Sequence, residues 1–385
     1  MKKIKSEKLQ IVMLGHKRIP SREGGVEIVV EELAVRMVQK GYEVTCFNRR
    51  GKHVSGENIE INPAEEYKGV HIRTVWTLDK KGLAAMTASA AAAWRAAIGK
   101  YDVVHFHAEG PCAMLWLPKL FGKRCIATIH GLDHQRAKWG KLGKAYILLG
   151  EKVAAKYADE IIVLSKGVQN YFMETYGRKT IMIPNGVSRA KKELPELISE
   201  KFGLEPEKYI LFLARLVPEK GVSYLIDAFK KVNTDKKLVI AGGASDSEDF
   251  VKLLHEKTEG DDRILFTGFV QGKMLAELYS NAYLYVLPSD VEGMPLSLLE
   301  AMSYGNCCLT SDISENTSVT ENYGVCFKKS DVKDLTEKLQ MLCDQEEMVR
   351  TYKDQAADYI CRKYDWDDVV TRTIDIYTKK GRIEK

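Results

Sequence analysis

Short apolar runs alternate with longer amphipathic segments along most of the chain. In the first half, mostly apolar runs at residues 9–15, 42–48 and 101–107 predict strands that are buried on both faces, as in a parallel sheet. Residues 26–40 repeat apolar positions with helical spacing, and Gly41 follows as a predicted C-terminal cap. Strand and helix therefore alternate as they do in nucleotide-binding sheets.

The same alternation starts again in the second half. It follows a turn signal at Pro184-Asn185-Gly186 and a polar, charged segment at 191–200, where we place the domain linker. The candidate strands of this half are residues 209–214, 237–241, 263–270 and 283–287. Residues from 331 onward predict helices only. The pattern predicts an α/β protein with two doubly wound parallel-sheet domains.

Length and composition fit this reading. A chain of 385 residues is long enough for two domains with large cores. No apolar run approaches the roughly 18 residues of a membrane span, and the basic start at residues 1–8 is followed by too short an apolar run for a signal peptide. The eight cysteines are scattered without a CxxC pair, which predicts buried, reduced thiols and a cytoplasmic location.

Charge divides the chain into a basic and an acidic half. The net charge is +13 over residues 1–190 and −8 over residues 191–385. The basic half suggests an anionic partner such as nucleic acid, an anionic membrane or a phosphorylated ligand, and no nucleic-acid-binding signature is evident. Basic side chains alternate with apolar ones across 135–157. This segment predicts either a basic amphipathic helix on a membrane or a helix with a solvated face over a core.

Polar residues of the first half follow predicted strands. The Gly24-Gly25 pair lies in a loop too long for G-x-G-x-x-G and predicts either a close approach to a phosphate or sugar, or a plain turn. His130 follows the strand at 124–129, the strand end at which parallel sheets bind ligands, and is predicted to line a cleft. His105 and His107 share one strand face, for which a strand end facing the cleft is favoured over a metal pair.

The segment 289–302 carries the clearest chemical pattern. Glu292 lies in a loop after an apolar strand, Glu300 lies in the apolar helix that follows, and Pro295 is predicted in the first helical turn. Free N–H groups and the helix dipole at such a junction favour an anion. At about 1.5 Å per residue the two carboxylates lie roughly 10 Å apart, a span that suits one ligand with an anionic centre.

Two cations follow another strand of the same predicted sheet. Arg215 comes directly after residues 209–214, and Lys220 follows five positions later. Because the carboxyl ends of parallel strands share one edge, these cations are predicted to face the same crevice as Glu292 and Glu300. Cations and a helix N-terminus suit a diphosphate, and ionised carboxylates accept hydrogen bonds from sugar hydroxyls. The set therefore describes a site for a nucleotide sugar.

These motifs resemble, in order, retaining glycosyltransferase family 4, which has the GT-B fold of two Rossmann-like domains facing across a cleft. The resemblance covers nearly the whole chain and rests on the E-x7-E pattern of Glu292 and Glu300, Ala214 to Gly221, Thr128 to Gly131, Ile183 to Val187, and Gly24-Gly25. The loop at residues 18–27 is also similar to that of bacterial cell-surface polysaccharide transferases. The loop Glu292-Gly293-Met294-Pro295 is two positions shorter than the family's Glu-Gly-Phe-Gly-Leu-Pro-like pattern, which affects the contacts expected with the donor sugar.

The resemblance implies a hexosyl- or deoxyhexosyltransferase in cell-surface polysaccharide biosynthesis. It would move a sugar from a UDP, dTDP or GDP sugar to a glycan or lipid-linked saccharide, with retention and without a metal, a cofactor or a protein nucleophile. The implied domains are residues 1–190, joined by the C-terminal helix 366–385, and residues 191–365. We expect the protein in the cytoplasm, at the inner face of the membrane. The alternatives are a GT-B-fold sugar-nucleotide epimerase and a non-catalytic sugar-nucleotide-binding protein.

The implied site residues divide by role. The catalytic residues are Arg215, Lys220, Glu292 and His130, of which the two cations stabilise charge on the leaving diphosphate in place of a metal ion. The donor-binding residues are Gly24, Gly25, Phe269, Val270, Gly293, Met294, Leu296 and Glu300. Within this set, Phe269 and Val270 flank the base and Glu300 holds the ribose. No metal site is predicted, because His130 and His134 lack the H-E-x-x-H pattern.

Overall fold

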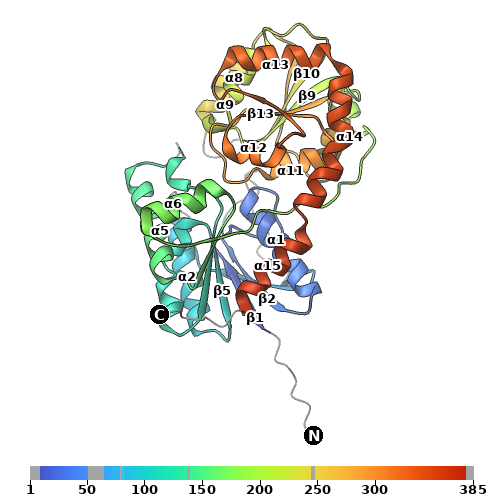
Figure 1. Ribbon diagram of the computed structural model, residues 1–385. Coiled ribbons are helices and arrows are strands. Elements are labelled where there is room, and N and C mark those ends of the chain that lie inside the picture. The colour runs from blue at the N-terminus through green and yellow to red at the C-terminus, as the bar shows by residue number, and fades with distance from the viewer. Residues whose placement is uncertain are drawn as a thin grey trace. The chain divides into compact units, whose positions relative to one another are not determined.

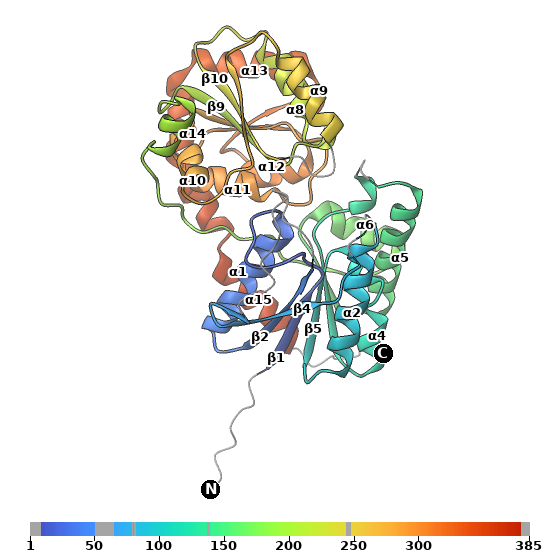
Figure 2. The same ribbon diagram turned by 180° about the vertical axis from the view of Figure 1, so that it is seen from behind.

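The computed structural model divides into two compact units (Figure 1, Figure 2). The first unit contains Met1–Asn185 and Trp366–Lys385, and the second unit contains Gly186–Asp365. The structure describes residues 9–50, 65–78, 80, 82–136, 139–243 and 248–378. The basic start at residues 1–8, Lys138 of the basic segment, and residues 379–385 of the expected C-terminal helix lie outside these ranges. Each unit is an α/β sheet with helices on both faces, which confirms the two predicted doubly wound domains.

The first unit is built on an eight-stranded sheet with the order β3-β4-β2-β1-β5-β6-β7-β8. The strands are β1 (Gln10–Leu14), β2 (Glu43–Arg49), β3 (Glu66–Tyr67), β4 (Val70–Val75), β5 (Val103–His107), β6 (Arg124–Ile129), β7 (Glu160–Val163) and β8 (Ile181–Met182). All neighbouring pairs are parallel except β3 with β4. Strand β1 lies between β2 and β5, so chain connections run outward from it in both directions.

Helices cover the two faces of this sheet differently. One face carries α2 (Ala84–Ile98), α3 (Glu109–Cys112), α5 (Lys141–Tyr157) and α6 (Lys166–Tyr176), whose apolar residues share one core with Val12, Phe106 and Ile129. The alanines of α2 are buried, and their small size lets this helix pack close to the sheet. The other helices include α1 (Gly25–Gln39) and α15 (Trp366–Thr378), which contact each other. Short helices α4 (Trp116–Leu120) and η1 (Asp133–Gln135) complete the unit.

The second unit is an all-parallel sheet with the order β11-β10-β9-β12-β13-β14. Its strands are β9 (Tyr209–Leu213), β10 (Lys237–Ala241), β11 (Ile264–Gly268), β12 (Leu284–Leu287), β13 (Cys308–Ser311) and β14 (Val325–Phe327). Successive side chains of a strand point to opposite faces. Tyr209 and Leu211 therefore pack in one core, and Ile210 and Phe212 pack in the other.

Different helices pack on the two faces of this sheet and contribute to the two cores. The first contains residues of α10 (Gly272–Asn281), α11 (Leu296–Ser303), α12 (Ser314–Thr320) and α14 (Glu346–Lys363). The second contains residues of α8 (Val222–Phe229), α9 (Glu248–Thr258) and α13 (Val332–Asp344). Buried on both faces, the strands carry the near-continuous apolar runs that identified them in the sequence.

The polar segment at 191–200 is not a linker. It belongs to the second unit, and its end forms the start of α7 (Leu197–Phe202). The apolar residue Ile198 is fully buried and Phe202 packs against the same core. Of the charged residues that suggested a linker, only Glu200 lies in this short helix, where it is exposed, and the others (Lys191, Lys192, Glu193 and Glu196) precede it. Their charge indicates a surface segment of the second unit and not a boundary between the units.

Candidate functional site

The strand order of the second unit places the predicted donor residues at one point. Strands β9 and β12 are neighbours, but β9 leads to β10 on one side and β12 leads to β13 on the other. The two connections therefore diverge above the carboxyl ends of adjacent strands, the position at which doubly wound sheets bind ligands. Arg215 and Lys220 follow β9, and Glu292 follows β12. The structure brings Lys220 and Glu292 into contact at this position.

Lys220 and Glu292 form an ion pair across this switch point. The Lys220 ammonium donates to the Glu292 carboxylate, and their side chains are only 15% and 7% exposed. Lys220 is the last residue of the 3₁₀ turn η2 (Pro218–Lys220), so the turn fixes the backbone position from which the lysine side chain extends. The sequence assigned these two residues to different parts of a ligand and gave no sign that they contact each other.

Backbone contacts hold the same two loops together. Gly221 has φ +71°, and a Cβ at this position would lie 2.0 Å from the carbonyl oxygen of Pro288. The hydroxyl of Tyr224 lies within hydrogen-bond distance of that carbonyl and 2.8 Å from Asp290 Oδ1. The amide of Asp290 donates to the carbonyl of Glu219 at 2.9 Å. The sequence reading missed these positioning residues, although a glycine directly after the candidate lysine was a signal for close approach.

The second predicted carboxylate, Glu300, lies within α11 and is partly buried. The hydroxyl of Tyr279 lies 3.4 Å from Glu300 Oε2 and 3.2 Å from the carbonyl oxygen of Ser297. Burial, followed by the charge of Glu300, raises the pKa of Tyr279 well above its usual value. The hydroxyl therefore stays protonated and donates a hydrogen bond to one of these oxygens. Pro295 is not in the first helical turn but precedes it as the cap residue, which leaves the helix to begin at Leu296.

The remaining donor-binding candidates of the second unit lie in the loops after β11 and β12 and at the start of α11. Phe269 and Val270 directly follow β11, and the Phe269 ring is 39% exposed. Val270, Met294 and Leu296 pack against one apolar core, which brings the loops after β11 and β12 to the same side of the sheet. The loop after β10 joins them, since a Cβ at Gly242 would lie 1.9 Å from the carbonyl oxygen of Ala214.

In the first unit, Gly24 precedes α1 and Gly25 begins it. Gly24 has an extended backbone, and a Cβ there would lie 2.4 Å from Glu27 Oε2. The Glu27 carboxylate is buried and accepts a hydrogen bond from the amide of Lys17 at 2.8 Å. The side chain of Glu27 therefore occupies the space beside Gly24, a feature that the sequence reading did not anticipate.

Three histidines of the first unit form a largely buried chain, in which His105 and His107 are fully buried and His130 is partly buried. His107 Nδ1 lies 3.1 Å from His130 Nε2. His105 contacts the hydroxyls of Thr128 at 2.7 Å and Tyr377 at 2.6 Å, so both of its ring nitrogens have partners. Burial lowers the pKa of His105 to about 3 and that of His130 to about 4. His130 is thus a neutral imidazole. His105 and His107, which were predicted at a strand end facing a cleft, are both fully buried.

The basic segment of the first unit forms α5 from Lys141 to Tyr157. Its buried residues are Ile147, Gly150, Glu151 and Ala154. The opposite face exposes Lys141, Lys144, Lys152 and Lys156. Leu142 and Leu149 are 89% and 50% exposed on this lysine-rich face. Among the described residues, no helix combines the length and apolar character needed to cross a membrane.

Both halves of the chain match known families. Residues 23–191 match the family described as Glycosyltransferase Family 4, and residues 196–359 match the family described as Glycosyl transferases group 1. The chain is 23% identical over 402 residues to an uncharacterized glycosyltransferase of Methanocaldococcus jannaschii, with 96% of this chain and 98% of that protein covered.

One further relative in sequence and one solved structure are similar to this chain. The chain is 29% identical over 239 residues to the UDP-Gal:alpha-D-GlcNAc-diphosphoundecaprenol alpha-1,3-galactosyltransferase of Escherichia coli, with 58% of this chain and 61% of that protein covered. The structure is similar to that of Anabaena HepE in complex with UDP-glucose, with a TM-score of 0.78, 17% identity and coverage of 95% and 98% of the two chains. The chain therefore belongs to the glycosyltransferases and combines a Glycosyltransferase Family 4 domain with a Glycosyl transferases group 1 domain in the GT-B fold.

Proposed function

We propose that the protein is a hexosyl- or deoxyhexosyltransferase that uses a nucleotide-diphosphate sugar and retains the configuration of the transferred sugar. The observation that carries this proposal is the Lys220–Glu292 pair at the switch point of the second unit, beside Arg215 and the start of α11. A largely buried ammonium and the amides of a helix start suit the two charges of a diphosphate. The relative solved in complex with UDP-glucose supports a uridine donor.

Each side chain has a proposed role in this reaction. Arg215 and Lys220 stabilise the charge that develops on the leaving diphosphate, and Glu292 orients Lys220 and accepts from the sugar. The amides of Gly293, Met294 and Leu296 contact the donor sugar. Glu300 accepts from the ribose hydroxyls, and Phe269 and Val270 flank the base. In the first unit, Gly24, Gly25 and the neutral His130 are proposed to contact the donor sugar, which the acceptor attacks from the face of the leaving group.

The ribose contact gives a direct test in binding. Glu300→Gln is expected to weaken UDP binding about 10–100-fold, because a hydrogen bond to a charged acceptor contributes about 1.5–3 kcal/mol. Isothermal titration calorimetry with UDP measures the change. Glu347→Gln, an exposed residue of α14, is the matched control and should bind UDP as the parent does. Equal affinity of the Glu300 variant and the parent would remove Glu300 from the site.

The same titration tests the proposed independence from metal ions. If Arg215 and Lys220 supply the positive charge, UDP affinity should be the same with EDTA as with added magnesium. A large gain in affinity with magnesium would show that a metal ion shares the diphosphate. Binding is the better readout here, because it reports on the second unit without requiring an acceptor.

We further propose a lipid-linked saccharide as acceptor, in cell-surface polysaccharide synthesis at the cytoplasmic face of the membrane. The lysine-rich face of α5 and its exposed Leu142 and Leu149 support this, since such faces bind anionic membranes. The Escherichia coli relative, whose name includes a diphosphoundecaprenol-linked substrate, supports the same acceptor class. The eight cysteines are free thiols, as expected for a reducing compartment.

Membrane binding can be measured with vesicles containing phosphatidylglycerol. The double variant Lys144→Glu, Lys152→Glu is expected to weaken co-sedimentation by about 30-fold or more, because each lysine near an anionic surface contributes about 1 kcal/mol. Lys208→Glu with Lys333→Glu, two exposed lysines of the second unit, provides the control. Failure of the parent protein to co-sediment at low salt would overturn the membrane assignment while leaving the donor site untouched.

Two other functions remain distinguishable by their products. A GT-B-fold epimerase would convert the nucleotide sugar into its epimer without any acceptor. A non-catalytic binding protein would bind the donor but neither hydrolyse it nor transfer the sugar. Chromatography of the nucleotide sugar after incubation with and without acceptor separates these outcomes from transfer.

A further inference from the structure

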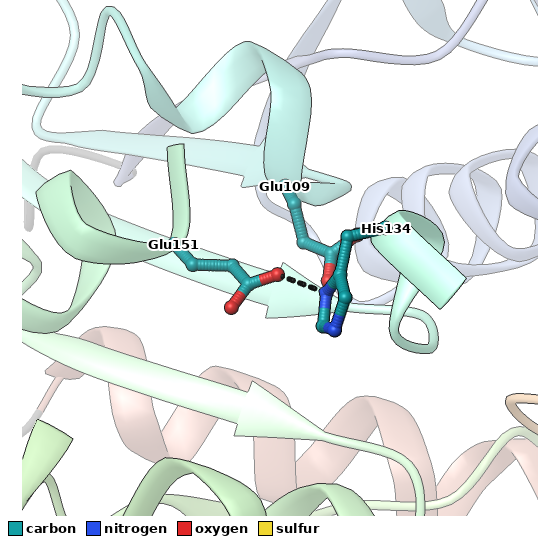
Figure 3. A group of neighbouring side chains, drawn as sticks. All are labelled: Glu109, His134 and Glu151. Atoms are coloured by element: carbon teal, nitrogen blue, oxygen red, sulfur yellow. Dashed lines mark hydrogen bonds and ion pairs between the residues drawn. The ribbon is translucent and has the colours of Figure 1, made fainter. Parts of the chain in front are cut away.

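Three titratable side chains of the first unit converge at a place that the proposed reaction does not use. Glu109 begins α3 after β5, His134 lies in η1 after β6, and Glu151 lies in α5. One carboxylate oxygen from each glutamate and one ring nitrogen of His134 all lie within 4.8 Å of one another. Figure 3 shows the three side chains pointing toward a common centre.

Close packing of two helices brings the glutamates together. A Cβ at Gly150 would lie 1.9 Å from the carbonyl oxygen of Glu109, so only glycine allows α5 to approach α3 this closely. Glu151 follows directly and is carried against Glu109. Both glutamates are completely buried, whereas the His134 side chain is 18% exposed.

In each of the two glutamates, one carboxylate oxygen accepts hydrogen bonds from neighbouring donors, and these bonds orient the carboxylate. Glu109 Oε2 accepts from the amide of Asp133 at 2.8 Å. Glu151 Oε2 accepts from the hydroxyls of Tyr171 at 2.8 Å and Tyr176 at 2.9 Å. These bonds leave the two Oε1 atoms directed inward. Around metal ions, outer hydrogen bonds fix the ligating groups in the same way.

The two inward-facing Oε1 atoms differ in their partners. Glu151 Oε1 lies 2.7 Å from His134 Nδ1. Glu109 Oε1 is buried and has no hydrogen-bond partner among the described residues. Two carboxylates buried side by side are unfavourable unless a positive charge or a proton neutralises them.

We propose that Glu109, His134 and Glu151 bind a divalent first-row transition-metal ion, with Zn²⁺ as the preferred occupant. A dication balances the two carboxylates, and the imidazole selects against Mg²⁺ and Ca²⁺, which favour oxygen ligands. The ion would tie η1 to α3 and α5 and so fix the loop that carries His130. This role is structural and independent of the donor site in the second unit.

Zinc content is the measurement that tests the site. The full-length protein is stripped with EDTA, dialysed against Zn²⁺, freed of excess metal and analysed by plasma mass spectrometry. We expect the parent and the control Glu174→Gln, an exposed glutamate of α6, to retain a single zinc ion per chain. Glu109→Gln and His134→Gln should lose it. Tyr171→Phe should lower zinc affinity about 10–100-fold, as expected for an outer-shell hydrogen bond.

Thermal unfolding adds a second readout. Zn²⁺ should raise the melting temperature of the parent and of Glu174→Gln, but not that of Glu109→Gln. If the parent retains no more zinc than Glu109→Gln, a shared proton neutralises the carboxylates and the metal site is refuted. Zinc retained equally by both ligand variants places the ion elsewhere and also refutes it. Circular dichroism identifies a variant that fails to fold, in which case Tyr171→Phe, which keeps every proposed ligand, decides the question.

Discussion

Lys220→Ala is expected to lower kcat for sugar transfer by about 10²–10³-fold, the range seen when one group that stabilises developing charge is removed. Two effects act in the same direction. The ammonium no longer faces the leaving diphosphate, and the Glu292 carboxylate, only 7% exposed, loses its ionic partner. An unpaired buried carboxylate would also repel the donor's phosphates, so donor binding should weaken together with turnover.

The measurement is a steady-state transfer assay with the donor identified by calorimetry. Lys208→Ala is the matched control, because Lys208 forms an exposed ion pair with Asp235 and lies away from the candidate site. The double variant Lys220→Ala, Glu292→Gln should be less impaired than the product of the single effects predicts, since the two side chains act as a pair. Turnover of Lys220→Ala within a few-fold of the parent would remove this lysine from the catalytic site.

Gly221→Ala is expected to destabilise the second unit and to reduce transfer at the same time. The residue has φ +71°, and the added Cβ would lie 2.0 Å from the carbonyl oxygen of Pro288. The left-handed backbone alone costs an alanine about 1–2 kcal/mol, and the steric conflict adds about 1–3 kcal/mol. Relieving that conflict moves the turn that carries Lys220 away from the loop that carries Glu292.

Urea unfolding and the transfer assay measure the two effects. Gly177→Ala is the control, because Gly177 has φ +60° but no atom within 4 Å of an added Cβ. This variant has the backbone cost without the steric conflict, and its kcat should stay near that of the parent. Equal losses of stability in the two variants would show that the approach of Gly221 to Pro288 is not what holds the loops together.

The sequence predicted the candidate donor residues because parallel sheets obey a simple rule. Functional side chains follow strand carboxyl ends, and those ends lie along one edge, so Arg215, Lys220, Glu292 and Glu300 were identifiable by position. Contacts between them were not identifiable. Lys220 and Glu292 are separated by 72 positions, and only the β9–β12 pairing makes them neighbours.

Glu109, His134 and Glu151 show the opposite case. No motif links them, and Glu151 stood in a lysine-rich segment that predicted a solvated or membrane-bound face. In the structure Glu151 lies on the buried face of α5, because Gly150 allows this helix to pack closely against α3. A residue's burial depends on which helix face meets its neighbours, and sequence spacing alone did not reveal it here.

By itself the sequence determined the α/β class, the two-domain organisation and the residues at the strand ends, because hydrophobic periodicity and turn chemistry are local properties. The tertiary structure decided the strand order, the Lys220–Glu292 and Tyr279–Glu300 contacts, the buried histidine chain and the convergence of Glu109, His134 and Glu151. These features depend on contacts between segments far apart in the chain. Such contacts depend on how whole helices and strands pack against one another, and no single stretch of sequence determines that packing.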